Sequence, residues 1–426
     1  MRETINRIVK GARKLRKHGL GDVFISSVYT EIIGFLASIF IVRMFSKDAY
    51  GYYAIAYNIY GYIAVFVGCG LNNAVLQYCS EKRDDNEKRG IYTFCLKFGS
   101  IFNIFLLAII PLLSLVLLTD LPRKYLLLMS GWPFVAYLSN YYLMRLRVIK
   151  DNRHFMLSNV ISASFFIALA AFMAKTVGIV GYIVALYCKY IISFTLSKFY
   201  LHEDNSYFSK SGISNDFKKE IIRYSIVCCL TNFASTIMML VDVTCVNYFV
   251  GDPSVVATYK TATQIPTALL FVPSSVIVFV FPYLAEHNKD LLWLKNNVKK
   301  LNLAVVAVNV IIGIVVYILA PFIVRILWGE RYLDAVEVLR ILVLNFVVTG
   351  TFNKVYGNLM VVVKKVNVNL AKTIVFSVLN VILDTIFIKY YGSIGAAIAT
   401  LIVSIGSSIF SYAYYRLWLS RQLKLS

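Results

Sequence analysis

Charged side chains interrupt several long apolar segments of this sequence, and they are the residues best suited to chemistry. A charge on a helix that enters a bilayer costs about 2.5–3.5 kcal/mol, so it usually faces protein or a water-filled cavity and indicates a functional site. A carboxylate in such a place can exchange a proton or hold Na⁺, and a cation can attract a phosphate. The embedded charges are Glu31, Lys97, Lys189, Asp242, Lys260, Glu337, Arg340, Lys354 and Asp384.

Glu31 and Lys189 lie near the middle of their apolar segments, and neither has an oppositely charged residue at i±3 or i±4. We predict that Glu31 serves ion coupling and that Lys189 lines an internal cavity. Lys260, together with Arg43 at the outer mouth, adds to this cationic lining, which favours anions such as phosphates. Lys97 and Lys354 belong to the same predicted set, with snorkelling toward the cytoplasmic interface as the alternative.

Asp242 and Lys260 lie at similar depths on either side of a tight outer loop, counting ~1.5 Å per residue. They are expected either to form a structural ion pair between two helices or to face a ligand. Asp242 and Asp384 complete the predicted ion-coupling set. Glu337 and Arg340, at i and i+3, are typical of a local surface pair near the outer interface.

Two further segments carry residues with a predicted role. Asn58, Asn72, Asn73 and Tyr57 are candidates to face sugar hydroxyls and rings, and close helix packing around neighbouring glycines is the alternative. In a later segment, prolines seven residues apart lie on nearly one face, and each removes a backbone hydrogen bond. We therefore expect a kinked helix with Pro266 and Pro273 as a hinge.

The composition requires a membrane around these segments. The chain is 59% hydrophobic and 15% charged, and its mean hydropathy is +0.70, so one water-soluble core cannot hold its apolar residues. Twelve apolar runs approach the ~20 residues that span a bilayer. They fall at about 22–43, 55–79, 92–118, 124–144, 155–174, 178–199, 222–249, 256–284, 301–325, 335–361, 368–388 and 393–417.

The formal net charge of +21 is explained by orientation and not by nucleic acid. Lys and Arg gather in alternate connections, as at Lys82, Arg83, Lys88 and Arg89, which places both termini in the cytoplasm by the positive-inside rule. Residues 1–21 form a basic amphipathic segment without a signal-peptide pattern, and they are expected to lie on the membrane surface.

The sequence gives little support to catalysis. The seven cysteines show no CxxC or Cys/His metal spacing, and all four histidines lie in predicted cytoplasmic segments. No phosphate loop of the GxxxxGK[ST] type occurs, and no connection is long enough to form a folded domain. We predict a carrier that is not an enzyme and that needs no cofactor or metal, with H⁺ or Na⁺ as a coupling ion.

The chain shows signs of internal duplication. Residues 43–59 resemble 249–265, with Tyr53, Ala56 and Ile59 answering to Tyr259, Ala262 and Ile265. Two further pairs in the same order are 150–152 with 365–367 and 178–185 with 392–399. We predict an all-α polytopic membrane protein of two parallel six-helix bundles related by a pseudo-two-fold axis. Its parts are a cytoplasmic segment 1–21, a bundle 22–200, a linker 201–220, a bundle 221–417 and a tail 418–426.

These features together resemble the Wzx-type O-antigen and polysaccharide flippases of the multidrug/oligosaccharidyl-lipid/polysaccharide exporter (MOP) superfamily. The resemblance rests on the order of the loose motifs at 45–51, 178–185, 328–342 and 392–399. It implies a V-shaped, MATE-like fold that alternates between inward- and outward-open forms. It also implies transport of undecaprenyl-diphosphate-linked oligosaccharide to the periplasmic face of a bacterial inner membrane. The predicted cations would then bind the diphosphate.

Two other functions stay open at this point. A multidrug or cation antiporter of the same fold is expected to have an acidic cavity, where this chain offers Lys189 and Lys260. A membrane glycosyl polymerase is expected to carry a long external loop with catalytic residues, which this sequence lacks. The resemblance further implies a polysaccharide polymerase and a chain-length regulator as partners, and no nucleic acid.

Overall fold

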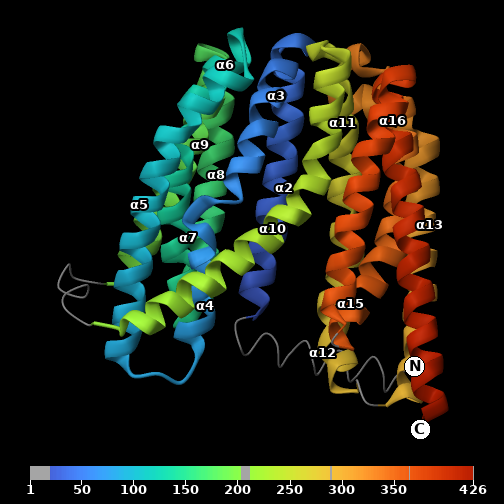
Figure 1. Ribbon diagram of the computed structural model, residues 1–426. Helices are drawn as coiled ribbons and strands as arrows, with labels where there is room; N and C mark the ends of the chain where they lie inside the picture. Colours follow the sequence, from blue (N-terminus) through green and yellow to red (C-terminus); the bar gives the residue numbers. More distant parts are fainter. Residues whose placement is uncertain (1–19, 203–211, 288–289, 364, 426) are drawn as a thin grey trace. The chain divides into compact units, whose positions relative to one another are not determined.

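A computed structural model describes residues 20–202, 212–287, 290–363 and 365–425, and every regular element in these ranges is helical (Figure 1). The predicted surface segment 1–21 lies almost wholly outside the described residues, as does the middle of the predicted linker, 203–211. The chain divides into two compact units. Unit 1 comprises residues 1–45 and 59–233, and unit 2 comprises residues 46–58 and 234–426.

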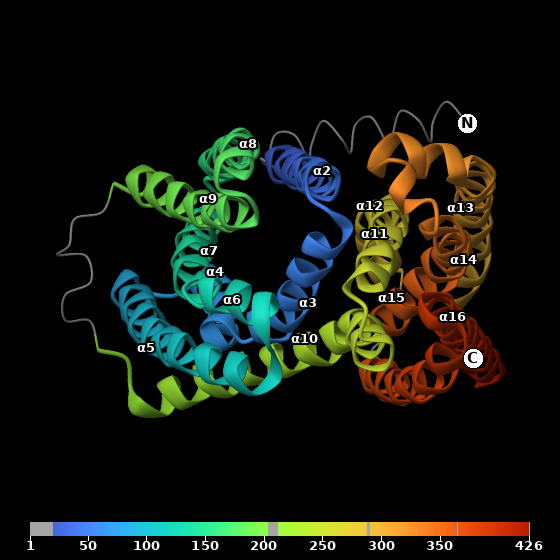
Figure 2. The same ribbon diagram turned by 90° about the horizontal axis from the view of Figure 1, so that it is seen from above.

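Unit 1 is a bundle in which helices that are not consecutive in the chain also pack together. It contains α2 (Leu20–Met44), α4 (Leu71–Ser80), α5 (Asp85–Leu117), α6 (Asp120–Leu128), α7 (Trp132–Val148), α8 (Asn152–Val177) and α9 (Ile179–Tyr200). Helix α2 packs against α8, and α8 packs against α9 (Figure 2). Tyrosines fill much of the core, because Tyr137 and Tyr141 are fully buried and donate to the backbone carbonyls of Cys95 and Tyr92.

Unit 2 is a second bundle built around α14 (Ala335–Val348), which contacts α11, α13 and α16 (Figure 2). Its other helices are α11 (Pro253–Leu269), α12 (Phe271–Glu286), α13 (Leu291–Trp328), α15 (Lys354–Val362) and α16 (Val366–Leu425). A short helix η3 (Glu330–Tyr332) precedes α14, and a π-helical turn η4 (Thr349–Asn353) joins α14 to α15.

Two helices contribute to both units. Helix α3 (Lys47–Ala64) belongs to unit 2 up to residue 58 and to unit 1 from residue 59. Helix α10 (Asn215–Val250) changes unit between residues 233 and 234. Each unit therefore contains one part of α3 and one part of α10.

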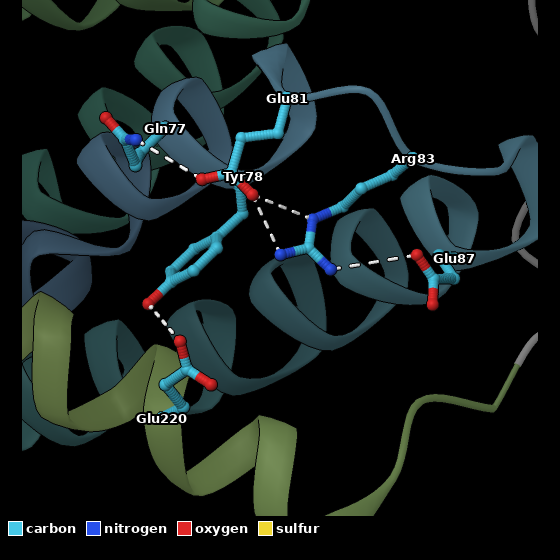
Figure 3. A network of polar contacts seen from close by, with 6 residues as sticks. All are labelled: Gln77, Tyr78, Glu81, Arg83, Glu87 and Glu220. Atoms are coloured by element: carbon cyan, nitrogen blue, oxygen red, sulfur yellow. Dashed lines mark hydrogen bonds and ion pairs between the residues drawn. The ribbon is translucent and has the colours of Figure 1, made fainter.

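The start of α10 is fixed to unit 1 by a polar network at the α4–α5 connection (Figure 3). The Arg83 guanidinium donates to Glu81 Oε2 from Nε at 3.1 Å and from Nη2 at 2.8 Å. The Arg83 Cζ atom also lies 4.6 Å from the ring centre of Phe217 in α10. In the same network, Tyr78 donates its hydroxyl proton to Glu220 Oε1 at 3.1 Å. The first turns of α10 thus bind α4 and the α4–α5 connection through hydrogen bonds and aromatic contacts.

A left-handed turn between α3 and α4 allows α10 to approach closely. Gly70 has φ +77°, and a Cβ atom there would lie 2.2 Å from the backbone oxygen of Ser225. Only glycine provides both this backbone conformation and this clearance. The turn therefore depends on Gly70 to bring α10 against unit 1.

Eight described helices are long and apolar enough to cross a membrane, and α10 adds a ninth when its two parts form one span. The 60-residue α16 contains a break at Gly392, φ +56°, and thus provides two successive crossings. Twelve crossings would also require the 17-residue α7 and the α11–α12 pair, which is divided at Leu270 between Pro266 and Pro273. The predicted all-α polytopic fold is confirmed, and the described helices are consistent with twelve crossings.

The predicted duplication has a counterpart in local geometry. Gly178 and Gly392 both have positive φ, at +73° and +56°. Three residues later, a Cβ atom on Gly181 or Gly395 would lie 2.2 Å from the carbonyl oxygen of Met173 or Phe387. A turn of the same form therefore precedes α9 and the second half of α16.

The repeated segments 150–152 and 365–367 also share a local geometry. The amide of Asp151 donates to the carbonyl of Leu146 at 2.9 Å, and the amide of Lys365 donates to the carbonyl of Met360 at 2.7 Å. Both are bonds from residue i to residue i−5, which close the end of a helix. Corresponding helix ends in the two halves of the sequence are therefore built alike.

Candidate functional site

Two carboxyl groups meet in the buried core of unit 2. Asp242 belongs to α10 and Asp384 to the first half of α16, and Asn380 contacts both carboxyl groups. Asn380 Nδ2 donates to Asp242 Oδ1 at 3.0 Å and to Asp384 Oδ2 at 2.9 Å. Two carboxyl groups this close disfavour the doubly ionised state, so the pair is suited to hold one proton.

Two hydroxyl groups complete the surroundings of the pair. Asp242 Oδ2 accepts from Tyr259 at 2.6 Å and from Thr400 at 2.7 Å. Asp384 is fully buried, and its Oδ1 atom has no hydrogen-bond partner in the part of the chain that the structure describes. Buried polar atoms without a partner are uncommon and costly. Carboxylate, hydroxyl and amide oxygens are also suitable ligands for a hard cation, so the cluster has the chemistry to exchange H⁺ or a cation such as Na⁺.

The fold of α16 explains how distant residues reach this cluster. Asn380 and Asp384 are one helical turn apart on the first half of α16 and therefore share a face. The chain then turns at Gly392, whose positive φ breaks the helix. Thr400, eight residues beyond the turn, comes back to Asp242. Tyr259 enters from α11, because it lies in the first half of that helix beyond the short α10–α11 loop.

The predicted ion pair between Asp242 and Lys260 was wrong. The Asp242 carboxylate is bound by Tyr259, Asn380 and Thr400, and no ion pair with Lys260 occurs among the described residues. The reason is helical geometry, because successive side chains on a helix are about 100° apart. Since Tyr259 faces Asp242, its neighbour Lys260 points elsewhere, and the Lys260 side chain is only partly buried.

Unit 1 contains Glu31 and Lys189, the two residues for which the sequence analysis predicts ion coupling and cavity lining. Glu31 of α2 lies close enough to Lys189 of α9 to interact with it electrostatically. The Lys189 ammonium lies 5.5 Å from the ring centre of Phe166 on α8, which suits a cation–π contact. Glu31 is exposed and Lys189 is partly buried. The roles of the two residues remain predictions.

The remaining predicted residues are dispersed. Arg43 and Lys97 are exposed in unit 1, and Lys354 is partly buried in unit 2. Of the predicted sugar-facing residues, Tyr57 and Asn73 are exposed, Asn72 is partly buried and Asn58 is buried. Pro266 and Pro273 are buried on either side of the α11–α12 division. The predicted local pair is confirmed, since Arg340 Nη1 lies 2.8 Å from Glu337 Oε1.

Comparison with known proteins identifies the family. The family described as polysaccharide biosynthesis protein matches the chain over residues 19–288. The chain belongs to this family. The resemblance to polysaccharide flippases seen in the sequence is thereby confirmed. No curated protein sequence matches the chain.

Solved structures show that this family member has the fold of the MOP superfamily. An inward-facing multidrug resistance MATE family transporter is 16% identical, with a TM-score of 0.79 over 93% of this chain and 96% of that one. The lipid II flippase MurJ, in an inward closed conformation, is 17% identical, with a TM-score of 0.73 over 92% of this chain and 87% of that one. A MOP transporter from Pyrococcus furiosus is 15% identical, with a TM-score of 0.60 over 95% and 93%. At these identities the similarity concerns the fold alone.

The structure of this family member also reveals polar residues that sequence reasoning missed. Tyr259, Asn380 and Thr400 bind the carboxyl pair, but neutral polar residues in apolar helices give no signal of which face they occupy. Lys372, near the start of the predicted span 368–388, is buried and donates to Ser411 Oγ at 3.0 Å. The spacing of Lys372, Asn380 and Asp384, at multiples of four, is the signal that could have indicated one polar face.

Proposed function

We propose that this protein is a flippase for undecaprenyl-diphosphate-linked oligosaccharide repeat units. It moves each unit from the cytoplasmic to the periplasmic leaflet of the bacterial inner membrane by alternating access. The product serves the biosynthesis of O-antigen, capsule or exopolysaccharide. The observation that carries this proposal is the match to the polysaccharide biosynthesis family over residues 19–288, and the fold shared with a lipid II flippase supports it.

The substrate's diphosphate is the group that the embedded cations would recognise. Lys189 and Lys260 lie in apolar helices, and Arg43 lies near the C-terminal end of α2. In the orientation predicted from the sequence, Arg43 would lie at the outer side and Lys97 and Lys354 would lie nearer the cytoplasm. An amine or guanidinium in a site of low dielectric attracts a phosphate more strongly than it would in water. The glycan would contact polar and aromatic side chains, for which Tyr57, Asn72 and Asn73 are the candidates.

The energy for directional transport would come from an ion gradient. The buried Asp242–Asp384 pair supports this part of the proposal, because Asn380 donates to both carboxyl groups and one carboxylate oxygen has no hydrogen-bond partner among the described residues. Protonation or cation binding at the pair would change the charge of unit 2, and a change of charge is a means to bias two conformations. Glu31 is a second candidate, since its charge acts on Lys189.

Deletion of the gene in a bacterium that makes a defined surface polysaccharide tests the proposal. The expected result is loss of surface polymer and accumulation of the finished lipid-linked unit on the cytoplasmic face of the inner membrane. Accumulation of that unit on the periplasmic face would instead indicate a polymerase. Unchanged polymer together with increased sensitivity to cationic drugs would indicate a multidrug antiporter.

A further inference from the structure

Asn58 of α3 binds α10 at a point next to the carboxyl pair. Its Nδ2 atom donates to the backbone oxygen of Leu240 at 3.2 Å and to Thr244 Oγ1 at 2.8 Å. Both acceptors belong to α10, and all three residues lie in unit 2. One side-chain amide thus joins two helices whose residues are 182 and 186 positions apart in sequence.

The two acceptors flank Asp242 in sequence and lie on the opposite side of the helix from it. Residues 240 and 244 are one turn apart and share a face, whereas residue 242 is rotated by about 200° from residue 240. The Asp242 carboxylate accordingly binds α11 and α16, while the other face of the same helical turn binds α3. This turn of α10 is therefore held between the carboxyl pair and Asn58.

Asn58 is also the last residue of α3 that belongs to unit 2. The other end of this half-helix is held at the outer side of unit 2. Lys47 forms an ion pair with Asp334, and Gln264 donates to the Tyr50 hydroxyl at 3.2 Å. The bond of Asn58 to α10 fixes the end at which α3 continues into unit 1.

The surroundings of Asn58 indicate that its side chain serves as a hydrogen-bond donor to α10 and does not only fill space in the core. Its side chain is only 2% exposed, and no described residue forms a hydrogen bond with its Oδ1 atom. An apolar residue of similar size would avoid this unsatisfied atom, and the hydroxyl of Thr244 already donates to the carbonyl of Leu240 in its own helix. The amide is therefore not needed to satisfy α10, and what it adds is a directional link between α10 and α3.

We propose that Asn58 is a positioning residue that transmits the ionic state of the Asp242–Asp384 pair to α3. When the pair gains or loses its ion, the turn of α10 that carries Asp242 changes its position, and the Asn58 bond moves the adjoining end of α3 with it. This inference rests on the proposed role of the pair in ion coupling. It gives Asn58 a different task from the sugar contact predicted from the sequence.

Hydrogen–deuterium exchange of the full-length protein in lipid nanodiscs tests this link without any substrate. Exchange is measured in peptides covering residues 47–58, across a pH series and with and without Na⁺. Asp242→Asn serves as a mimic of the neutral carboxyl group. In the otherwise unchanged protein, we expect this substitution and the saturating ion condition to alter exchange in 47–58 by about tenfold.

The substitution Asn58→Leu should abolish this response, so that neither Asp242→Asn nor the ion alters exchange in 47–58. Asn358→Leu is the matched control, because Asn358 donates only to the carbonyl of Lys354 in its own helix, and it should leave the response intact. If Asn58→Leu does not fold, Thr244→Val removes one acceptor and should reduce the response. An undiminished response in Asn58→Leu or Thr244→Val overturns the inference.

The exchange experiment and a separate transport assay of Asp242→Asn together separate this inference from the proposed function. If the unmodified protein shows an ion response at α16 but none in residues 47–58, the proposed role of Asn58 is contradicted. Absence of any ion response at α16, combined with transport that does not depend on Asp242, contradicts the proposed coupling site instead.

Discussion

Asn380 donates its side-chain amide to both Asp242 and Asp384, at 3.0 and 2.9 Å, and so holds two carboxyl groups from different helices within one polar cluster. An amide nitrogen has two protons and can serve two acceptors at once. Like charges at such close range disfavour the doubly ionised state. The cluster therefore combines a fixed geometry with a variable charge, which is what an ion-coupling site in a membrane requires.

Replacing one carboxyl group should uncouple transport from its ion gradient. Asp384→Asn keeps the size of the side chain and removes its negative charge, so we expect gradient-driven translocation to fall by about tenfold or more. Exchange without a gradient should continue. Translocation in proteoliposomes with and without an imposed gradient measures this effect. Thr385→Val, at an exposed position one residue away, is the control. Equal gradient dependence in Asp384→Asn and the unmodified protein would argue against the pair.

Removing the Tyr259 hydroxyl should change ion affinity without abolishing transport. This group donates to Asp242 Oδ2 at 2.6 Å, and hydrogen bonds to charged groups contribute about 1.5–3 kcal/mol. In Tyr259→Phe the carboxylate loses a donor and should hold a proton more tightly, so with H⁺ as the coupling ion the proton concentration at half-maximal transport should fall by about tenfold. Tyr391→Phe, at an exposed position on α16, should cause no shift. A shift of equal size in both variants would contradict the assignment.

The close approach of α10 to the α3–α4 turn should make Gly70 intolerant of substitution. Gly70→Ala places a Cβ atom 2.2 Å from the Ser225 oxygen in addition to straining a positive φ. Gly251→Ala strains a similar φ of +71° but meets no atom within 4 Å, so it should cost only about 1–2 kcal/mol. Thermal unfolding in detergent measures the comparison. Comparable unfolding temperatures for the two variants would mean that α10 does not press against this turn.

The Arg83 network should depend on the guanidinium group and not on charge alone. Arg83 binds Glu81 through two nitrogens and lies over the Phe217 ring, and a lysine cannot reproduce either geometry. Because the network is partly exposed, both Arg83→Met and Arg83→Lys should destabilise the start of α10 by about 1 kcal/mol. Exchange of amides in residues 215–225 reports this loss. Lys82→Met, at the exposed neighbouring position, is the control, and full rescue by Arg83→Lys would contradict the geometric argument.

The sequence predicts the architecture of this protein well, for a physical reason. A bilayer demands long apolar helices and sorts basic residues by side, so the positions of the spans follow from composition alone. The turns at Gly178 and Gly392 were also recognisable, because repeated glycines mark positions that need a special backbone conformation. Asp242 and Asp384 could be selected as candidates because a charge inside an apolar helix is unusual.

The contacts of those charges could not be predicted from the sequence. Depth along the helix suggested Lys260 as the partner of Asp242, but rotation about the helix axis decides contacts, and it selects Tyr259. Rotation depends on how the helices pack, and the apolar stripe that reveals packing in a soluble helix is absent when lipid surrounds the helix. The division of α3 and α10 between the two units likewise depends on tertiary contacts and has no local signal.

Translocation by the purified protein tests the central claim most directly. Proteoliposomes are loaded with an undecaprenyl-diphosphate-linked oligosaccharide from the host's own polysaccharide, and an ion gradient is imposed. The fraction of the glycan that an externally added glycosidase can reach is followed with time. The account predicts that this fraction changes with the gradient for the unmodified protein and not for Asp242→Asn. A glycan distribution that is the same with and without the protein would contradict it.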